Sequence, residues 1–370
     1  MTLEGRRVLG VLLVALGLAG MQAARAEPYI AVQQGYKCVQ CHVNPTGAGL
    51  RNDFGAVFSQ NVMAARPLPQ GIPPWDGKLG DFVRVGGNVR EAWTRTDIQD
   101  QDATEDWELQ EARLYGGIDA FSNRLALVLD MSFAQDEEDV RQAYAQWSNP
   151  NGGWYAKAGR FFLPFGWRVQ DDGAFTRQVT GINRTGDRDY EGVELGLETT
   201  EWSAQLAVTN DGDISGSDVD TGSGTQVTAQ AVWVRPSGRV GVAASVADAD
   251  AGDRTLGTVF GGVRTGPVAW LGEVDVVRDE GYEDGTRNLV AVLAEADWAV
   301  TKGHNLRLSG EWLEPDSPLD DDEQTRWSLV YEYTPIAFVQ LRAGARVHDG
   351  NPQNDPENRN VYFLELHAFF

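Results

Sequence analysis

Two cysteines and a histidine are the residues of this sequence whose types and spacing best suit chemistry. Cys38, Cys41 and His42 form a C-x-x-C-H run, which is the spacing of c-type haem attachment. From one turn of chain, the two thiols can reach the two vinyl groups along one edge of a porphyrin. The next side chain then lies beneath the iron, where a neutral imidazole nitrogen is a suitable ligand. We therefore predict one covalent haem c, bound by Cys38 and Cys41, with His42 as the axial ligand of the iron.

A zinc site and a thioredoxin-like redox pair also use two closely spaced cysteines. The chain has no further cysteine, so a zinc site would lack its second pair of ligands. A thioredoxin-like redox pair needs a βαβ context, which the flanking sequence does not provide. The second axial ligand is open: Met63 is the only methionine nearby and a thioether is a common sixth ligand, but Met63 fits helix packing equally well. His304, His348 and His367 are the other candidates.

The first 26 residues have the features of a secretory signal peptide. Arg6 and Arg7 precede an apolar run over 8–21, and Ala24-Arg25-Ala26 supplies a small-x-small cleavage site. Export agrees with the motif, because haem is attached covalently outside the cytoplasm. No later apolar stretch approaches the roughly 20 residues of a spanning helix.

Residues 27–75 form the predicted haem segment. We expect strand or coil over 27–37, a turn over 43–49 and a helix over 50–65, where Phe54, Val57, Phe58 and Val62 fall on one face. A proline-rich linker over 67–74 ends the segment. So short a segment lacks the core volume to bury a haem alone. We therefore expect another part of the chain to cover the cofactor.

From residue 78 to residue 370 the pattern has period two, which is typical of strands. In one example Leu125, Leu127 and Leu129 share a face opposite Asp130 and Ser132. We predict an all-β fold, a 16-stranded antiparallel transmembrane β-barrel preceded by the small α-helical haem segment. The predicted strands are 79–96, 106–121, 123–135, 138–149, 153–163, 189–200, 201–211, 223–235, 237–248, 253–266, 267–279, 286–300, 303–314, 323–335, 336–349 and 358–370.

Alternation also occurs in soluble sandwiches, but three features favour an outer-membrane barrel. Tight connections, such as Ser122-Asn123 and Pro335-Ile336, alternate with long acidic ones. An even strand count places the start of the first strand and the end of the last strand on the periplasmic side. The chain ends on Phe370, which resembles the terminal aromatic residue by which outer-membrane barrels are recognised for insertion. Aromatic residues near strand ends are candidates for the two interfacial girdles: Trp107, Trp147, Trp154, Trp202, Trp270, Trp298 and Trp312.

The charge distribution adds expectations about partners. A net charge of −23 disfavours nucleic acid, and the acidic loops suit cations such as Fe²⁺ at the outer mouth, although charge runs are more often simply solvated. Inward-facing positions carry both signs, which suits a wet lumen or a docked segment: Glu194, Glu198, Glu273, Asp275, Glu295, Asp297, Glu311, Glu332, Glu365, Arg307, Arg342 and Arg346. The longest loop, 164–188, is rich in arginine (Arg168, Arg177, Arg184 and Arg188). These arginines could line an anion path, pair with acids of the lumen or bind haem propionates.

Two resemblances follow from these motifs. The stretch from Gly159 to Gly166 resembles the G-x-F-x-x-P-F-G stretch of the phosphate-selective porin O/P family. The leader, the Cys38 to His42 motif, the proline-rich linker and the barrel together resemble the fused monohaem cytochrome–porins. That resemblance implies an Fe(II)-oxidising electron-transfer protein of the bacterial outer membrane. Its haem segment would be periplasmic or inside the lumen, with extracellular Fe²⁺ as donor, a periplasmic electron carrier as acceptor and outer-membrane lipids around it.

Two other functions agree with the same residues. One is an anion or general diffusion porin whose haem segment is a plug or sensor, and conductance in planar bilayers distinguishes it. The other is a soluble periplasmic cytochrome with a β-sandwich, which the outer-membrane fraction would not contain.

Overall fold

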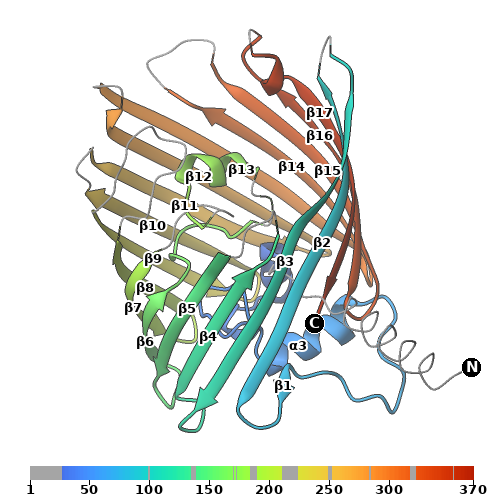
Figure 1. Ribbon diagram of the computed structural model, residues 1–370, viewed down its shortest axis with the longest axis vertical. Helices are drawn as coiled ribbons and strands as arrows, with labels where there is room; N and C mark the ends of the chain where they lie inside the picture. Colours follow the sequence, from blue (N-terminus) through green and yellow to red (C-terminus); the bar gives the residue numbers. More distant parts are fainter. Residues whose placement is uncertain are drawn as a thin grey trace, which may run out of the picture.

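One antiparallel sheet closes on itself in the computed structural model of this chain (Figure 1). Consecutive strands pair from β2 to β17, and β17 pairs with β2 to complete the ring. The structure describes residues 27–98, 101–134, 139–169, 171, 173–183, 190–210, 224–248, 252–282, 285–316, 322–352 and 354–370. The predicted leader and its cleavage site lie outside these residues.

Sixteen strands form the ring, and a two-residue strand, β1 (Lys78–Leu79), pairs with β2 beside it. The predicted barrel is confirmed, and the predicted strand ends agree with the observed ones to within a few residues. The strands are β2 (Val83–Ile98), β3 (Thr104–Ala120), β4 (Leu125–Ser132), β5 (Asp139–Ser148), β6 (Trp154–Arg160), β7 (Glu191–Glu198), β8 (Trp202–Asn210), β9 (Thr225–Arg235), β10 (Gly238–Asp248), β11 (Arg254–Thr265), β12 (Val268–Tyr282), β13 (Gly285–Thr301), β14 (His304–Glu314), β15 (Gln324–Ile336), β16 (Val339–Asp349) and β17 (Arg359–Phe369).

The apolar face of each strand points outward and the polar face points inward. On β4, Leu127 and Leu129 are each 42% exposed, whereas Asp130, the residue after Leu129, is fully buried in the barrel. All seven tryptophans predicted for the girdles are exposed on the outer surface. This arrangement is the reverse of a soluble protein and suits a hydrocarbon surround.

Inward charges are paired across neighbouring strands, where opposite residues lie closest. Each of these pairs is both a register pair and an ion pair: Lys157–Glu194, Asp297–Arg307, Glu311–Arg326, Glu332–Arg342 and Arg342–Glu365. The mixed-sign lumen expected from the sequence is therefore a connected network rather than a set of solvated charges.

Connections at one end of the barrel are short and those at the other end are mostly long. The short ones are residues 121–124, 149–153, 199–201, 236–237, 266–267, 302–303 and 337–338. The turn predicted at Pro335-Ile336 was placed two residues early. Strand β15 continues through Ile336, and Phe338 adopts the left-handed backbone conformation (φ 71°) that reverses the chain.

The N-terminal segment, residues 27–75, begins with helix α2 (Pro28–Gln34). The prediction of strand or coil there was wrong. Pro28 stands in the first helical turn, and Gly35 ends the helix with a φ of 68°, and these are standard start and stop residues. The helix expected over 50–65 corresponds to α3 (Asp53–Phe58) and the π-helical turn η2 (Ser59–Met63). None of the helices in the described ranges combines the length and hydropathy of a membrane span.

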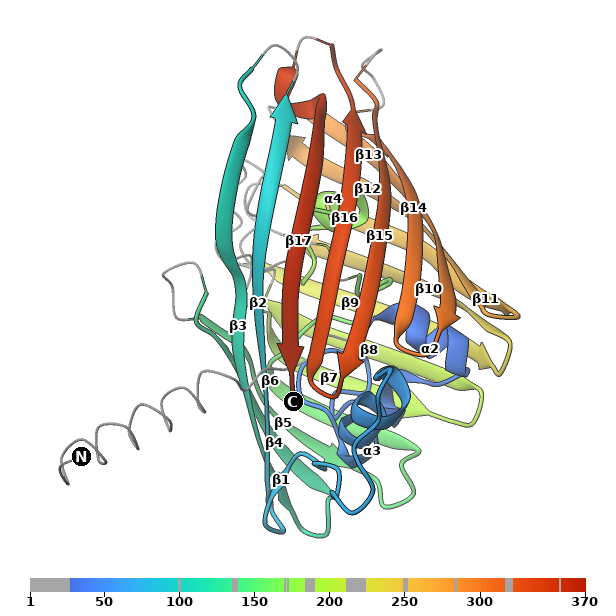
Figure 2. The same ribbon diagram turned by 90° about the vertical axis from the view of Figure 1, so that its right-hand side faces the viewer.

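Two parts of the chain enter the barrel from opposite ends (Figure 2). Helix α2 packs Tyr29 and Val32 against Ala269 and Leu271 of β12, near the short connections. The β6–β7 loop, residues 161–190, carries helix α4 (Phe175–Thr180) inside the ring. Most of its buried apolar side chains join the inner face of the barrel in one core cluster.

Candidate functional site

Cys38, Cys41 and His42 lie on one tight turn at the end of the barrel that has short connections. The turn η1 (Cys38–Gln40) is a 3₁₀ helix, and the carbonyl of Cys38 accepts hydrogen bonds from the backbone N–H groups of Cys41 (3.1 Å) and His42 (3.0 Å). This folding brings the three side chains to one cavity that is partly open to solvent. The spacing read from the sequence thus places all three on a shared site.

The cavity has walls from both the N-terminal segment and the barrel. Gln205 of β8, Val234 of β9 and Arg239 of β10 line it close to short connections. Aromatic rings supply much of the remaining lining: Tyr36, Phe58, Trp167 and Phe260. A largely apolar cavity with few polar groups is typical of cofactor sites.

His42 presents a neutral imidazole to this cavity. The residue is 5% exposed, and burial together with the Arg51 guanidinium lowers the pKa of His42 to about 3. Its Nδ1 atom is buried without a hydrogen-bond partner, which ordinarily costs about 1–3 kcal/mol. A neutral imidazole is what a haem iron requires of a histidine ligand.

The two thiols are also in a suitable state. Both cysteines are free, and burial raises the pKa of Cys41 to about 11 and raises that of Cys38. They are therefore neutral and sit among apolar side chains, where a thioether is as well accommodated as a thiol. The donor set and the cavity together fit a covalent haem.

Met63 is the candidate sixth ligand that the structure brings to the site. It ends η2 and lines the same cavity as Cys38, Cys41 and His42. The three histidines weighed beside it do not line that cavity. His304 stacks on Tyr333 with ring centroids 4.4 Å apart, His367 contacts Gln340 and Asn88 at 2.8 Å, and His348 lies on β16.

Helix α3 holds the motif in place through Asn52 and Gly55. The Asn52 side chain accepts a hydrogen bond from the Gly55 N–H (2.9 Å) and donates one to the carbonyl of Val39 (3.0 Å). A Cβ atom at position 55 would lie 2.0 Å from the carbonyl oxygen of Cys41. Only glycine therefore allows the helix to approach the motif this closely.

If Cys38 and Cys41 bind a covalent haem, we expect Gly55→Ala to reduce haem content several-fold, because the new methyl group must displace the backbone at Cys41. The measurement is haem-stain intensity per unit of folded barrel in the outer-membrane fraction. Gly116→Ala is the matched control, since Gly116 does not have a left-handed backbone and a Cβ there meets no atom within 4 Å. Equal haem content in the two variants would contradict the proposed packing.

The β6–β7 loop contacts the turn that follows the motif. Arg168 donates hydrogen bonds to the carbonyl of Gly47 (2.9 Å) and to Thr46 Oγ1 (2.8 Å), both in the turn after His42. Arg177 instead binds carbonyl oxygens of its own loop, at Val169 and Asn183. Arg184 and Arg188 lie outside the described residues. Arg168 thus ties the loop to the turn after His42.

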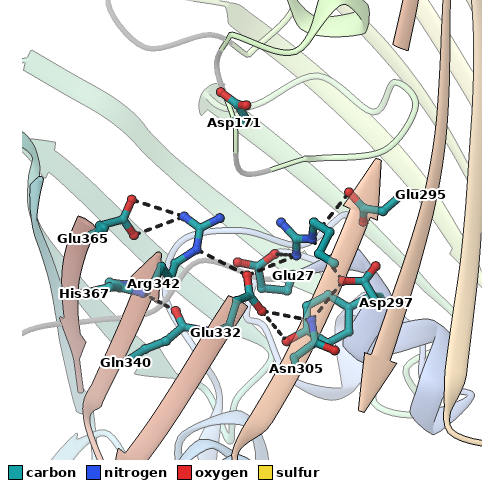
Figure 3. Close-up of polar contacts among 12 residues, drawn as sticks. Glu27, Asp171, Glu295, Asp297, Asn305, Glu332, Gln340, Arg342, Glu365 and His367 are labelled. Carbon is teal, nitrogen blue, oxygen red and sulfur yellow. Dashed lines mark hydrogen bonds and ion pairs between the residues drawn. The ribbon is translucent and has the colours of Figure 1, made fainter. Parts of the chain in front are cut away.

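The start of the N-terminal segment is held by buried charges of the barrel (Figure 3). Arg307 donates to Glu27 Oε2 (2.6 Å) and to Asp297 Oδ1 (3.0 Å). Tyr29 donates its hydroxyl to Glu332 Oε2 (3.0 Å), and Arg342 lies 3.3 Å from Glu332. The segment is thereby part of the same network that joins β13 to β17.

A second contact of this kind was not predicted from the sequence. Lys157 of β6 donates to Glu194 Oε1 (2.7 Å) and to Asn44 Oδ1 of the N-terminal segment (3.0 Å), and all three side chains are buried. Glu194 was expected to face the lumen, but nothing local marks Lys157 or Asn44. The alternation along β6 predicts that the Lys157 side chain points into the barrel. Its contact with Asn44, 113 residues away, depends on how the N-terminal segment docks.

Comparison with known proteins identifies the fold. No protein-family model matches the sequence, and no curated protein matches it either. Among solved structures, a loop-deletion mutant of the outer membrane protein OmpT of Vibrio cholerae aligns with a TM-score of 0.61 and 13% identity, over 78% of this chain and 100% of that one. The anion-selective porin of Comamonas acidovorans gives 0.61 and 10%, over 78% and 99%.

OprB of Pseudomonas putida gives a TM-score of 0.60 and 10% identity, over 78% of this chain and 94% of that one. The chain therefore has the fold of outer-membrane porins. At this level of identity the likeness concerns the fold alone.

Proposed function

We propose that this chain is a bacterial outer-membrane protein that carries one covalent haem c at the periplasmic mouth of its barrel and passes electrons from an extracellular donor to a periplasmic carrier. The observation that supports it best is the convergence of Cys38, Cys41, His42 and Met63 on one cavity between the N-terminal segment and the barrel wall. When bound there, haem supplies a one-electron redox centre.

The residues around the cavity have distinct tasks in this proposal. Cys38 and Cys41 would hold the cofactor covalently, His42 would offer the iron its buried neutral nitrogen, and Met63 would offer a thioether. The rings of Trp167 and Phe260, whose centroids lie 5.2 Å apart, supply apolar lining. An apolar lining lowers the dielectric around a bound cofactor and so influences its redox potential.

The orientation of the barrel supports the choice of acceptor. Bacterial barrels place short turns in the periplasm and long loops outside, so the cavity opens on the periplasmic side. The long-loop end carries exposed acids, among them Asp102, Glu105, Asp106 and Glu108. A negative rim attracts cations and suits Fe²⁺ as the donor.

A diffusion porin is the second candidate, and the likeness to porin folds favours it. Free diffusion requires a water-filled path through the ring. The inward carboxylates Asp130, Glu194 and Asp297 are fully buried, and Glu332 is 1% exposed. These charges on the barrel wall are covered by the N-terminal segment, the β6–β7 loop and neighbouring side chains. Such coverage favours a closed lumen.

One experiment separates these functions. The outer-membrane fraction is examined by haem-stained gel, and the purified protein is then tested for conductance in planar bilayers and for reduction by Fe²⁺. Electron transfer predicts a haem-positive band, little conductance, and haem reduction when Fe²⁺ is added outside intact cells. A haem-negative band with steady conductance would establish the diffusion porin instead.

A further inference from the structure

Three arginines face the cavity without a carboxylate beside them. Arg51, Arg168 and Arg239 all line it, and no ion pair among the described residues involves any of them. The two other charged side chains on the cavity are neutralised, because Glu27 binds Arg307 and Lys37 lies 2.7 Å from Glu198. In a chain with a net charge of −23, an unpaired positive surface at one cavity requires an explanation.

The unpaired arginines differ in how their N–H groups are used. Both terminal nitrogens of Arg168 donate to protein oxygens, so its part is to hold the turn after His42. Arg51 Nη1 and Arg239 Nε are buried and have no hydrogen-bond partner. Arg51 comes from the N-terminal segment and Arg239 from strand β10, on the barrel wall.

Both free donors are fixed in position by other contacts. Arg51 lies over the Phe369 ring, 5.1 Å from its centroid. Arg239 uses its Nη2 atom to bind the carbonyl oxygens of Ala31 (2.6 Å) and Tyr36, which leaves Nε for another partner. Burying a charged donor without an acceptor is costly. Two such donors on one cavity therefore indicate an anionic ligand with two separate acceptor groups.

We infer that Arg51 and Arg239 bind the two propionate carboxylates of the haem, so that one of the two contacts comes from the barrel and the cofactor is shared between segment and wall. The inference rests on the proposed function, since it takes haem as the ligand. Guanidinium groups form strong charge-assisted hydrogen bonds with carboxylates. A positive charge beside the cofactor also favours its reduced form, which carries one positive charge fewer.

The test uses Arg51→Gln and Arg239→Gln in the full-length protein, with Arg264→Gln as matched control. Arg264 also bridges the barrel and the N-terminal segment, through the carbonyl of Gln33 (2.7 Å), but it does not line the cavity. Covalent haem is first quantified by haem stain, and the redox midpoint potential is then measured by spectroelectrochemical titration.

Cys38 and Cys41 should keep the haem attached in all three variants. Each cavity variant should lower the ratio of reduced to oxidised haem at fixed ambient potential about tenfold, which is 59 mV for one electron. Arg264→Gln should leave this ratio unchanged, and Arg239→Lys should recover most of the loss. Arg239→Lys keeps the positive charge at this position, so it tests the effect of charge even if Arg239→Gln assembles poorly.

Two results overturn the inference in distinguishable ways. Haem present at an unchanged potential in both cavity variants refutes the arginine contacts alone. Absence of covalent haem from the unmodified protein refutes the proposed function and the propionate contacts together.

Discussion

Replacement of Cys38 and Cys41 by serine is expected to abolish covalent haem completely. A thioether forms from a thiol, and a serine hydroxyl does not add to a vinyl group in its place. Serine is close to cysteine in size, and the turn around Cys38 is held by backbone hydrogen bonds that serine leaves intact. The barrel should therefore still fold, since its sixteen strands pair without any contribution from the two sulfurs.

The measurement is a haem-stained denaturing gel, with the amount of folded barrel scored separately by its heat-dependent mobility. Met63→Leu is the matched control, because Met63 lines the same cavity and forms no covalent bond in the proposed site. It should keep the stain and change only the absorption features that depend on the sixth ligand. Haem staining that survives in the double serine variant would mean that the cofactor is attached elsewhere.

The barrel was predictable from the sequence because its signal is local and repeated. Alternation along β4 places Leu127 and Leu129 outward and Asp130 inward whatever the neighbouring strands are, and the observed exposures follow that pattern. Turn chemistry then separates the strands. The main error in the barrel, at Pro335-Ile336, arose where a proline suggested a turn that the chain makes at Phe338 instead.

The interior was much less predictable, because its contacts join residues far apart in the sequence. The motif identified Cys38, Cys41 and His42 by spacing alone. Arg239, however, is a single arginine at the start of a strand, and only the docking of the N-terminal segment gives it a role. Helix α2 was missed for a different reason: at seven residues it is too short for helical periodicity to appear, although Pro28 and Gly35 marked its ends.

Loss of the buried Arg307 charge should be the most damaging single change at the junction of segment and barrel. Arg307 lies within 3.5 Å of four carboxylates, those of Glu27, Glu295, Asp297 and Glu332. Arg307→Ala leaves these buried acids without their principal counter-charge, and breaking a buried pair in this way costs about 3–5 kcal/mol. The ring of strands keeps its backbone hydrogen bonds, so the N-terminal segment should be released first.

Released segment and opened lumen can be measured together. Arg307→Ala should increase single-channel conductance in planar bilayers and make the N-terminal segment sensitive to added protease. The unmodified protein should conduct little and should not be cleaved in this segment. Arg235→Ala is the matched control, since the Arg235–Glu201 pair also joins a strand to a neighbouring turn but is 48% and 40% exposed at its two side chains. Exposed pairs contribute about 0–1 kcal/mol, so that variant should behave as the unmodified protein does.

A double-mutant cycle with Glu27→Gln identifies the contact responsible. If Arg307 acts through the N-terminal segment, Glu27→Gln alone should open the barrel in part, and the two changes together should cost less than the sum of their separate effects. Purely additive effects would locate the role of Arg307 within the barrel wall, at Asp297 of the neighbouring strand. Closure of the lumen would then depend on the β6–β7 loop. The ion pair between Arg307 and Glu27 would not be what fixes the cavity with Cys38 and His42 to the barrel.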